Sequence, residues 1–81
     1  MAFTPELIAE LEFLSLFNLS NTQEGLKVHH TATPSAIAAA QRLHDKGLIS
    51  LPDGGYLTGL GLEAAAHAQN VLTILKLPQA A

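Results

Sequence analysis

Apolar residues near the start of the chain recur at the three- and four-residue spacing of an amphipathic helix. The stripe consists of Leu7, Leu11, Leu14 and Phe17, widened by Phe13 and Leu16. Thr4 and Pro5 suit an N-cap and a first helical residue, and Asn18 marks the expected end. The acids of this segment fall outside the stripe and are expected on a solvated face: Glu6, Glu10 and Glu12.

The next segment carries two competing patterns. Two overlapping capping-box spacings within residues 20–24 favour the start of a short helix, which Gly25 weakens. The alternation of Leu26, Lys27 and Val28 instead fits a short strand. The pattern favours a short helix that passes into an extended segment, with the strand as the alternative.

A better-bounded helix is predicted for residues 34–46. Thr33 serves as its N-cap, Pro34 as its first residue and Gly47 as the residue just past its end. Four apolar side chains are expected to face the core: Ala36, Ile37, Ala40 and Leu43.

A β-hairpin and a last helix follow. Residues 48–51 and 56–58 are prone to form strands, and the intervening Pro-Asp-Gly-Gly sequence is typical of a turn. Thr58 can cap a helix over residues 59–76, which Pro78 follows. Its apolar stripe is Leu60, Ala64, Ala68, Val71 and Leu75.

This last helix is apolar over more than one face. Residues outside the stripe that add apolar surface are Leu62, Leu72, Ile74 and Leu77. A helix apolar over so much of its circumference either completes the core over the first helix or forms an interface. The four residues are therefore candidates for a homodimer contact built from this helix and the first one.

Composition narrows the class of protein. The chain has 81 residues, which predicts one domain over residues 1–81, and 48% of them are hydrophobic. It has no cysteine, which excludes disulfides and thiol nucleophiles and fits a cytoplasmic protein. The net charge of -3 disfavours nucleic-acid binding, and no apolar run is long enough for a membrane span.

The segment of residues 38–65 resembles the helix–wing–helix part of winged helix-turn-helix regulators. The matching residues are Leu43, Lys46, Gly47, Leu48, Ile49, Gly54, Gly55, Tyr56, Leu57, Thr58, Gly61, Glu63 and Ala64. The whole chain also resembles an uncharacterised family of small bacterial conserved hypothetical proteins. The first resemblance implies a mainly α, winged-helix-like fold with about four helices and a two-stranded hairpin wing.

The same resemblance implies that the helix over residues 34–46 enters the major groove of DNA. Its candidate contacts are Ser35, Ala38, Arg42 and Lys46, and Ala39 is also expected to be exposed. Arg42 alone among them can make a bidentate guanine contact. The wing tip, residues 52–54, has no cation for phosphate, and position 62 is a leucine. These departures make DNA binding the alternative rather than the first hypothesis.

Enzymatic and metal-binding functions have little support. His29 and His30 could join Glu63 and His67 at a metal, but the sequence contains no HExxH motif and no ligand set at a required spacing. No catalytic motif surrounds any serine, and no phosphate-binding glycine pattern occurs. We therefore expect no catalytic site, metal, cofactor or small-molecule ligand. The favoured function is a non-enzymatic module for protein–protein interaction or self-association.

Overall fold

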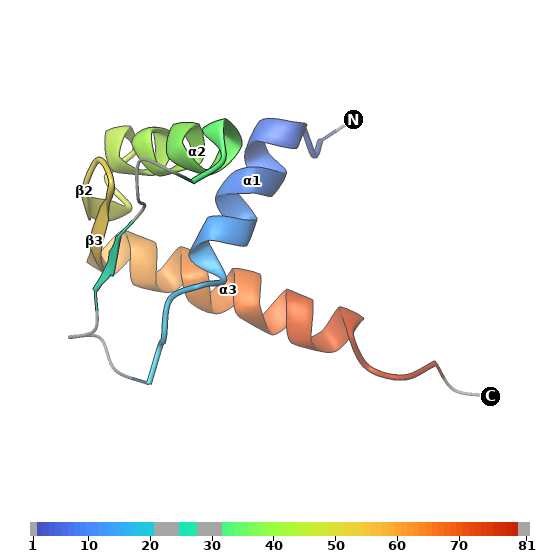
Figure 1. The fold of residues 1–81 in the computed structure, drawn as a ribbon. Coiled ribbons are helices and arrows are strands. Elements are labelled where there is room, and N and C mark those ends of the chain that lie inside the picture. The colour runs from blue at the N-terminus through green and yellow to red at the C-terminus, as the bar shows by residue number, and fades with distance from the viewer. Residues whose placement is uncertain (1, 21–24, 28–31, 80–81) are drawn as a thin grey trace.

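The computed structural model describes residues 2–20, 25–27 and 32–79. Three helices and three strands lie in these residues (Figure 1). In chain order they are α1 (Pro5–Leu14), β1 (Leu26–Lys27), α2 (Pro34–Asp45), β2 (Ile49–Leu51), β3 (Gly54–Leu57) and α3 (Gly59–Leu75). The protein is therefore mainly α with an antiparallel hairpin, as predicted.

The prediction of four helices was wrong for the part of the chain that the structure describes, which contains three. Ser20 and Gly25, at the two ends of the expected short helix, are not helical, and residues 21–24 lie outside the described residues. Leu26 and Lys27 pair with the hairpin, so the strand predicted as the alternative is confirmed at these two residues. Backbone pairing across the sheet therefore decides the conformation of Leu26 and Lys27.

Threonine caps begin all three helices as predicted. The Oγ1 atoms of Thr4, Thr33 and Thr58 accept hydrogen bonds from the backbone N–H three residues later, at 3.2, 3.2 and 3.0 Å. Each bond satisfies one donor that a helix leaves unpaired at its start. Gly47 follows α2 with a φ of +82°, which confirms its role in ending that helix.

The first helix is shorter than the sequence pattern predicts. It ends at Leu14, and the chain then tightens, with the N–H of Leu16 donating to the Phe13 carbonyl and that of Phe17 to the Leu14 carbonyl. The Ser15 hydroxyl also donates to the Glu12 carbonyl at 2.6 Å. This tighter turn still brings Phe17 into the core. The last residue of the predicted apolar stripe is therefore buried, although the helix does not reach Asn18.

The sheet has three strands rather than the expected two. Its order is β1-β3-β2, with both neighbours antiparallel to β3. The two-stranded wing was thus an incomplete prediction, because the partner of β3 on its other edge comes from a segment 27 to 29 residues earlier, where Leu26 faces Gly55 and Lys27 faces Gly54. The hairpin turn consists of Pro52 and Asp53, and the two glycines that follow it at the start of β3, Gly54 and Gly55, have φ values of 129° and 77°.

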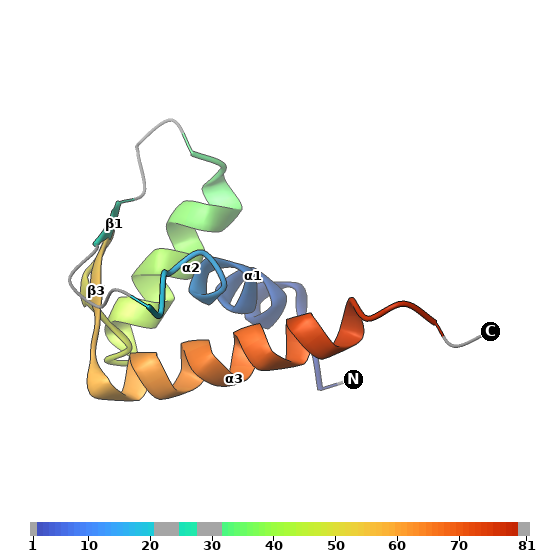
Figure 2. The same cartoon turned by 90° about the horizontal axis from the view of Figure 1, so that it is seen from below.

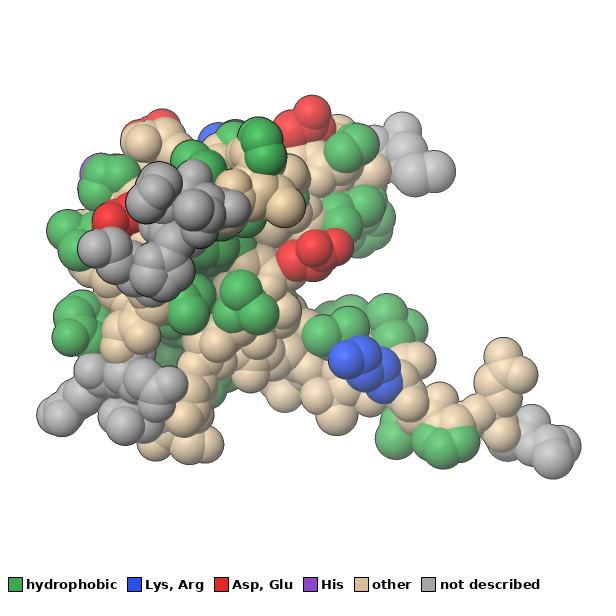
Figure 3. Space-filling view, viewed as in Figure 1, with side chains coloured by type: hydrophobic (Ala, Val, Ile, Leu, Met, Phe, Trp, Pro, Cys, Tyr) green, Lys and Arg blue, Asp and Glu red, His purple; other side chains and the backbone are tan. Residues whose placement is uncertain are grey.

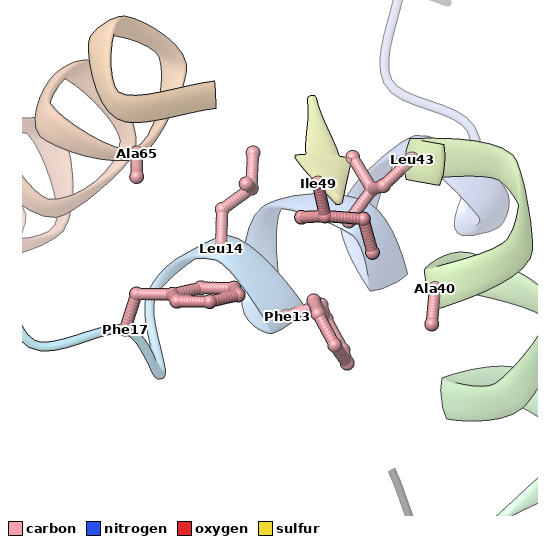
Figure 4. Packing of buried hydrophobic residues seen from close by; sticks show 7 residues of the cluster. All are labelled: Phe13, Leu14, Phe17, Ala40, Leu43, Ile49 and Ala65. Carbon is pink, nitrogen blue, oxygen red and sulfur yellow. The ribbon is translucent and has the colours of Figure 1, made fainter. Parts of the chain in front are cut away.

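The core lies where α1, α2, the hairpin and the first half of α3 meet (Figure 4). Its buried members are Phe13, Leu14, Phe17, Ala40, Leu43, Ile49 and Ala65. The rings of Phe13 and Phe17 contact edge to face at a centroid distance of 5.8 Å. On α2 the burial of Ala40 and Leu43 is confirmed, whereas Ile37 is exposed and Ala39, which we expected to be exposed, is fully buried.

The start of α3 is fixed against the beginning of the hairpin. The N–H of Thr58 donates to the Leu48 carbonyl at 3.0 Å, and the Thr58 hydroxyl donates to the Gly47 carbonyl at 2.7 Å. A Cβ atom placed on Gly61 would lie 1.8 Å from the Leu48 carbonyl oxygen, so only glycine allows this close approach. The helix then runs across the body of the molecule and out beyond it (Figure 2).

Candidate functional site

The C-terminal half of α3 projects from the body of the protein (Figures 1 and 2). Its last tether is Gln69, whose Nε2 donates to the carbonyls of Phe17 at 2.8 Å and of Leu14 at 3.3 Å. Every residue from Asn70 to Gln79 is exposed. We call residues 70–77 the arm.

Large apolar side chains dominate the arm. They are Val71, Leu72, Ile74, Leu75 and Leu77. Leu75 is 75% exposed and Leu72, the least exposed of the five, is 40% exposed. Three of the four predicted interface residues, Leu72, Ile74 and Leu77, therefore lie on the arm. Leu62, the fourth, lies on the packed half of α3 and is only just exposed, at 38%.

A second apolar surface lies on α1. Leu7 and Leu11 are exposed, and they precede the buried Leu14 by two turns and one turn on the same helix face. On α3, Leu72 lies two turns beyond the buried Ala65, again on the same face. The core-facing stripes of both helices thus continue past the point where the two helices contact each other.

The molecule is open between these two stripes. Figure 3 shows an opening between α1 and the projecting end of α3, with apolar side chains on both sides and an acidic side chain at its upper edge. We call this opening the notch, and from the helix face that they share with Leu14 we expect Leu7 and Leu11 of α1 to line it. Single exposed apolar residues are common on protein surfaces, whereas large contiguous apolar patches are typical of interaction sites.

The overall dimensions agree with an open shape. The Cα radius of gyration is 13.1 Å, against about 11.7 Å for a compact chain of this length. The accessible surface is 5763 Å², against about 4,700 Å² for a compact monomer of 8.5 kDa. The protein therefore exposes roughly 1,100 Å² more than its mass requires.

The side of the molecule that faces α2 holds an ion-pair cluster. Glu10 of α1, expected on a solvated face, is buried at 5% exposure, so that prediction was wrong. Its Oε2 accepts from Arg42 Nε at 3.1 Å, and its Oε1 accepts from Lys46 Nζ. Arg42 also donates through Nη2 to the Glu6 carbonyl at 3.1 Å. Two cations from α2 thus neutralise one buried carboxylate of α1.

This cluster shifts the titration of Glu10. Burial, the largest single influence, raises the pKa of its carboxyl. Hydrogen bonds from Lys46 and Arg42 and the positive charges of both together outweigh burial, so the pKa is lowered overall. Glu10 therefore remains ionised at neutral pH and holds α1 to α2.

Of the four candidate DNA-contacting residues, two are exposed to solvent and two belong to this ion-pair cluster. Ser35 and Ala38 are exposed near the start of α2, as a groove-entering helix would require. Arg42 and Lys46 point at Glu10 instead, and Ala39 lies in the interior. The sequence could not reveal this pairing, because Glu10 lies more than 30 residues away from both cations.

The residues considered for metal binding do not form a described site. His29 and His30 lie outside the described residues, and Glu63 and His67 are exposed on α3. Among residues 2–20, 25–27 and 32–79, no group of three potential ligands approaches closely enough to hold a metal ion. His44 has a buried Nδ1 atom without a hydrogen-bond partner, and its nearest acid is Asp45 at 3.9 Å.

Comparison with known proteins identifies the family. A model of a family of unknown function, DUF5669, matches residues 1–76, and the chain belongs to that family. This agrees with the resemblance to an uncharacterised family. No curated protein and no solved structure matches the chain. In the described part of the chain, no helix has both the length and the apolar character needed to cross a membrane.

Proposed function

We propose that this protein is a non-enzymatic, winged-helix-like module of the cytoplasm that acts by binding protein through the arm of α3. The observation that carries the proposal is the arm itself, on which five large apolar side chains are exposed beyond the body. Each such side chain gains about 1.5–3 kcal/mol when it is transferred fully from water to an apolar contact. A partner that covers the arm supplies that contact.

The arrangement of the elements supports the winged-helix part of the proposal. A helix in the position of α2 is followed by a glycine-turned hairpin and a long last helix, and β1 completes the sheet on the far side of β3. Winged-helix domains share this succession, and a fold by itself does not assign a function.

The charge arrangement supports protein rather than DNA as the partner. Phosphate contacts by lysine and arginine supply most of the affinity for DNA. Arg42 and Lys46, the two cations on α2, already pair with Glu10. Turning them toward phosphate would leave a buried carboxylate without its partners, which costs stability.

A photo-crosslinking amino acid tests the proposal in the cells that produce the protein. Placed at Ile74 it reports contacts of the arm, and placed at Ala38 it reports contacts of the exposed start of α2; both side chains are solvent-accessible. We expect a protein adduct at position 74 that Leu75→Asp removes, and no DNA adduct at position 38. A DNA adduct at position 38 without any protein adduct at position 74 would contradict the proposal.

The second candidate is a winged-helix DNA-binding regulator, favoured by the exposure of Ser35 and Ala38 on α2. It is tested by fluorescence anisotropy with duplex DNA at about 50 and 200 mM salt, conditions between which phosphate-driven binding weakens by orders of magnitude. Binding at micromolar concentration that weakens with salt, and that Arg42→Ala reduces, would place this candidate first. Absence of binding at both salt concentrations supports the interaction module.

A further inference from the structure

We infer that the partner of the arm is a second copy of this chain, held in a reciprocal clasp. Each arm lies in the notch of the other molecule and packs against Leu7 and Leu11 of the other α1. This inference rests on the proposed function, since it names the occupant of the same surface. The observations that carry it are the match between arm and notch and the amount of surplus surface.

The two surfaces match in the spacing of their apolar side chains. The arm contributes six helical residues, 70–75, and α1 contributes ten, which correspond to about 9 and 15 Å of helix. Leu7 and Leu11 form an exposed ridge at four-residue spacing, and Val71 and Leu75 form another on the arm. Ridges of this spacing on two helices pack into each other's grooves.

Two-fold symmetry satisfies both surfaces at once. One molecule presents an arm and a notch, so a two-fold axis places each arm in the opposite notch and leaves neither surface uncovered. A different protein in the notch would have to cover the arm and α1 with separate surfaces of its own. The self-complementary arrangement needs no additional element.

The surface area agrees with one dimer interface. A stable dimer buries about 800 Å² per partner. The surplus over a compact monomer belongs to the whole chain and is roughly 1,100 Å², which leaves room for one interface of that size.

One charged side chain lies on the arm. It is Lys76, which follows Leu72 by one helical turn on the same face and is exposed, so its flexible stem can keep the ammonium group in water at the edge of the contact. Asn70 and Thr73 lie on the side of the arm away from Leu72 and Leu75, where they remain in water. On α1, Glu10 turns toward α2 and is already paired with Arg42 and Lys46.

Cysteine crosslinking tests the clasp directly, because the natural chain has no cysteine. Two purified proteins, one with Leu7→Cys and one with Leu75→Cys, are mixed and oxidised, and the crossed disulfide is measured. The matched control replaces Leu75→Cys with Thr73→Cys, on the polar side of the same arm. Both apolar positions are exposed in the single chain, so neither substitution disturbs the core.

We expect the crossed disulfide between positions 7 and 75 to form at least about ten times faster than that between positions 7 and 73. We also expect Leu75→Asp to weaken the dimer at least about 100-fold, because a symmetric contact loses the leucine twice. Equal rates for the two pairs would overturn the clasp, as would a wild-type protein that sediments as a monomer at 200 µM. The sedimentation measurement on the wild-type protein needs no substitution, so it remains decisive if a variant misfolds.

The clasp and the proposed function can fail separately. If the protein is monomeric in solution but forms an adduct with a different protein at position 74 in cells, only the clasp is contradicted. If it is monomeric and forms no adduct at that position, the clasp and the proposed function are both contradicted.

Discussion

The two halves of α3 are opposites in side-chain size and burial. The half that packs on the body carries small residues where it touches the core, with Gly61 and Ala65 buried and Ala64 and Ala68 partly buried. The arm carries large apolar side chains, and all of them are exposed. The free-energy cost of exposing a side chain to water grows with its apolar area, so hydration alone would favour large side chains in the buried half and small ones in the exposed half. The difference agrees with our proposal that α3 packs on the body through its first half and on a partner through its second.

The small residues of the first half also explain how the helix is placed. Because Gly61 has no Cβ atom, the helix axis approaches the Leu48 carbonyl closely enough for Thr58 to bond both Gly47 and Leu48. The helix direction is thereby fixed at its start, and its length then carries the arm out of the body. Substitutions in the first half should therefore change folding, and substitutions in the arm should change association.

Gly61→Ala should have the largest effect. Its Cβ atom would meet the Leu48 carbonyl oxygen, which is backbone and cannot move aside, so α3 must shift. We expect a loss of at least about 3 kcal/mol in the free energy of unfolding, measured by urea denaturation. The matched control is Gly59→Ala, where a Cβ atom meets nothing within 4 Å. Equal stability of the two variants would contradict the close approach of α3 to the hairpin.

A pair of leucine-to-alanine substitutions compares the body with the arm. Leu14→Ala removes a buried core side chain and should cost about 2–3 kcal/mol of unfolding free energy. Leu72→Ala, on a half-exposed arm residue, should cost less than about 1 kcal/mol when the protein is dilute enough to be monomeric. Dilute urea denaturation measures both. Similar losses would mean that the arm belongs to the folding unit of the monomer.

Glu10→Gln tests the ion-pair cluster that joins α1 to α2. The folded-state pKa of Glu10 is lowered, so its contribution to stability is present above the unfolded-state pKa and is lost as pH falls through the folded-state value. We expect a cost of about 1 kcal/mol at pH 7, reduced by the exposure of Lys46 and Arg42 to solvent. The difference between wild type and variant should shrink in the same urea titrations as the pH falls and the Glu10 carboxylate becomes protonated. A difference that stays constant from pH 7 down to acid pH would show that the charge of Glu10 is not what stabilises the fold.

Thr58→Ala should cost about 1 kcal/mol of unfolding free energy, comparable to Glu10→Gln, because it removes the cap of α3. The variant also loses the hydrogen bond from the Thr58 hydroxyl to the Gly47 carbonyl. Thermal unfolding followed by circular dichroism measures the loss of stability. Thr73→Ala, an exposed change within the arm, serves as the control and should leave the melting temperature of the monomer nearly unchanged.

Features of the fold that depend on neighbouring residues were predictable from the sequence. The caps at Thr4, Thr33 and Thr58 and the helix end at Gly47 each rest on a bond or a φ value within a few residues. The positions of α2, the hairpin and α3 followed from them. The Pro-Asp-Gly-Gly turn sequence between two strand-prone segments predicted two strands of the sheet.

Features that depend on distant partners were missed or left open. Glu10 lies outside the apolar stripe of α1, and its burial is favourable only because it forms ion pairs with Arg42 and Lys46, which are distant in the sequence. For Leu26 and Lys27 the sequence offered a strand only as the alternative to a short helix, and pairing with the free edge of β3 made them a strand. On α3 the sequence identified an excess of apolar faces, but it could not indicate that the body ends near Gln69 and leaves Leu72, Ile74 and Leu77 uncovered.

Sedimentation equilibrium over about 1 to 200 µM tests the central claim most directly, namely that the arm is an association surface. Wild type should change from 8.5 kDa toward twice that mass as concentration rises, and Leu75→Asp should remain at 8.5 kDa with an unchanged circular dichroism spectrum. A wild-type protein that remains at 8.5 kDa throughout, or a variant that associates as well as wild type, would contradict it.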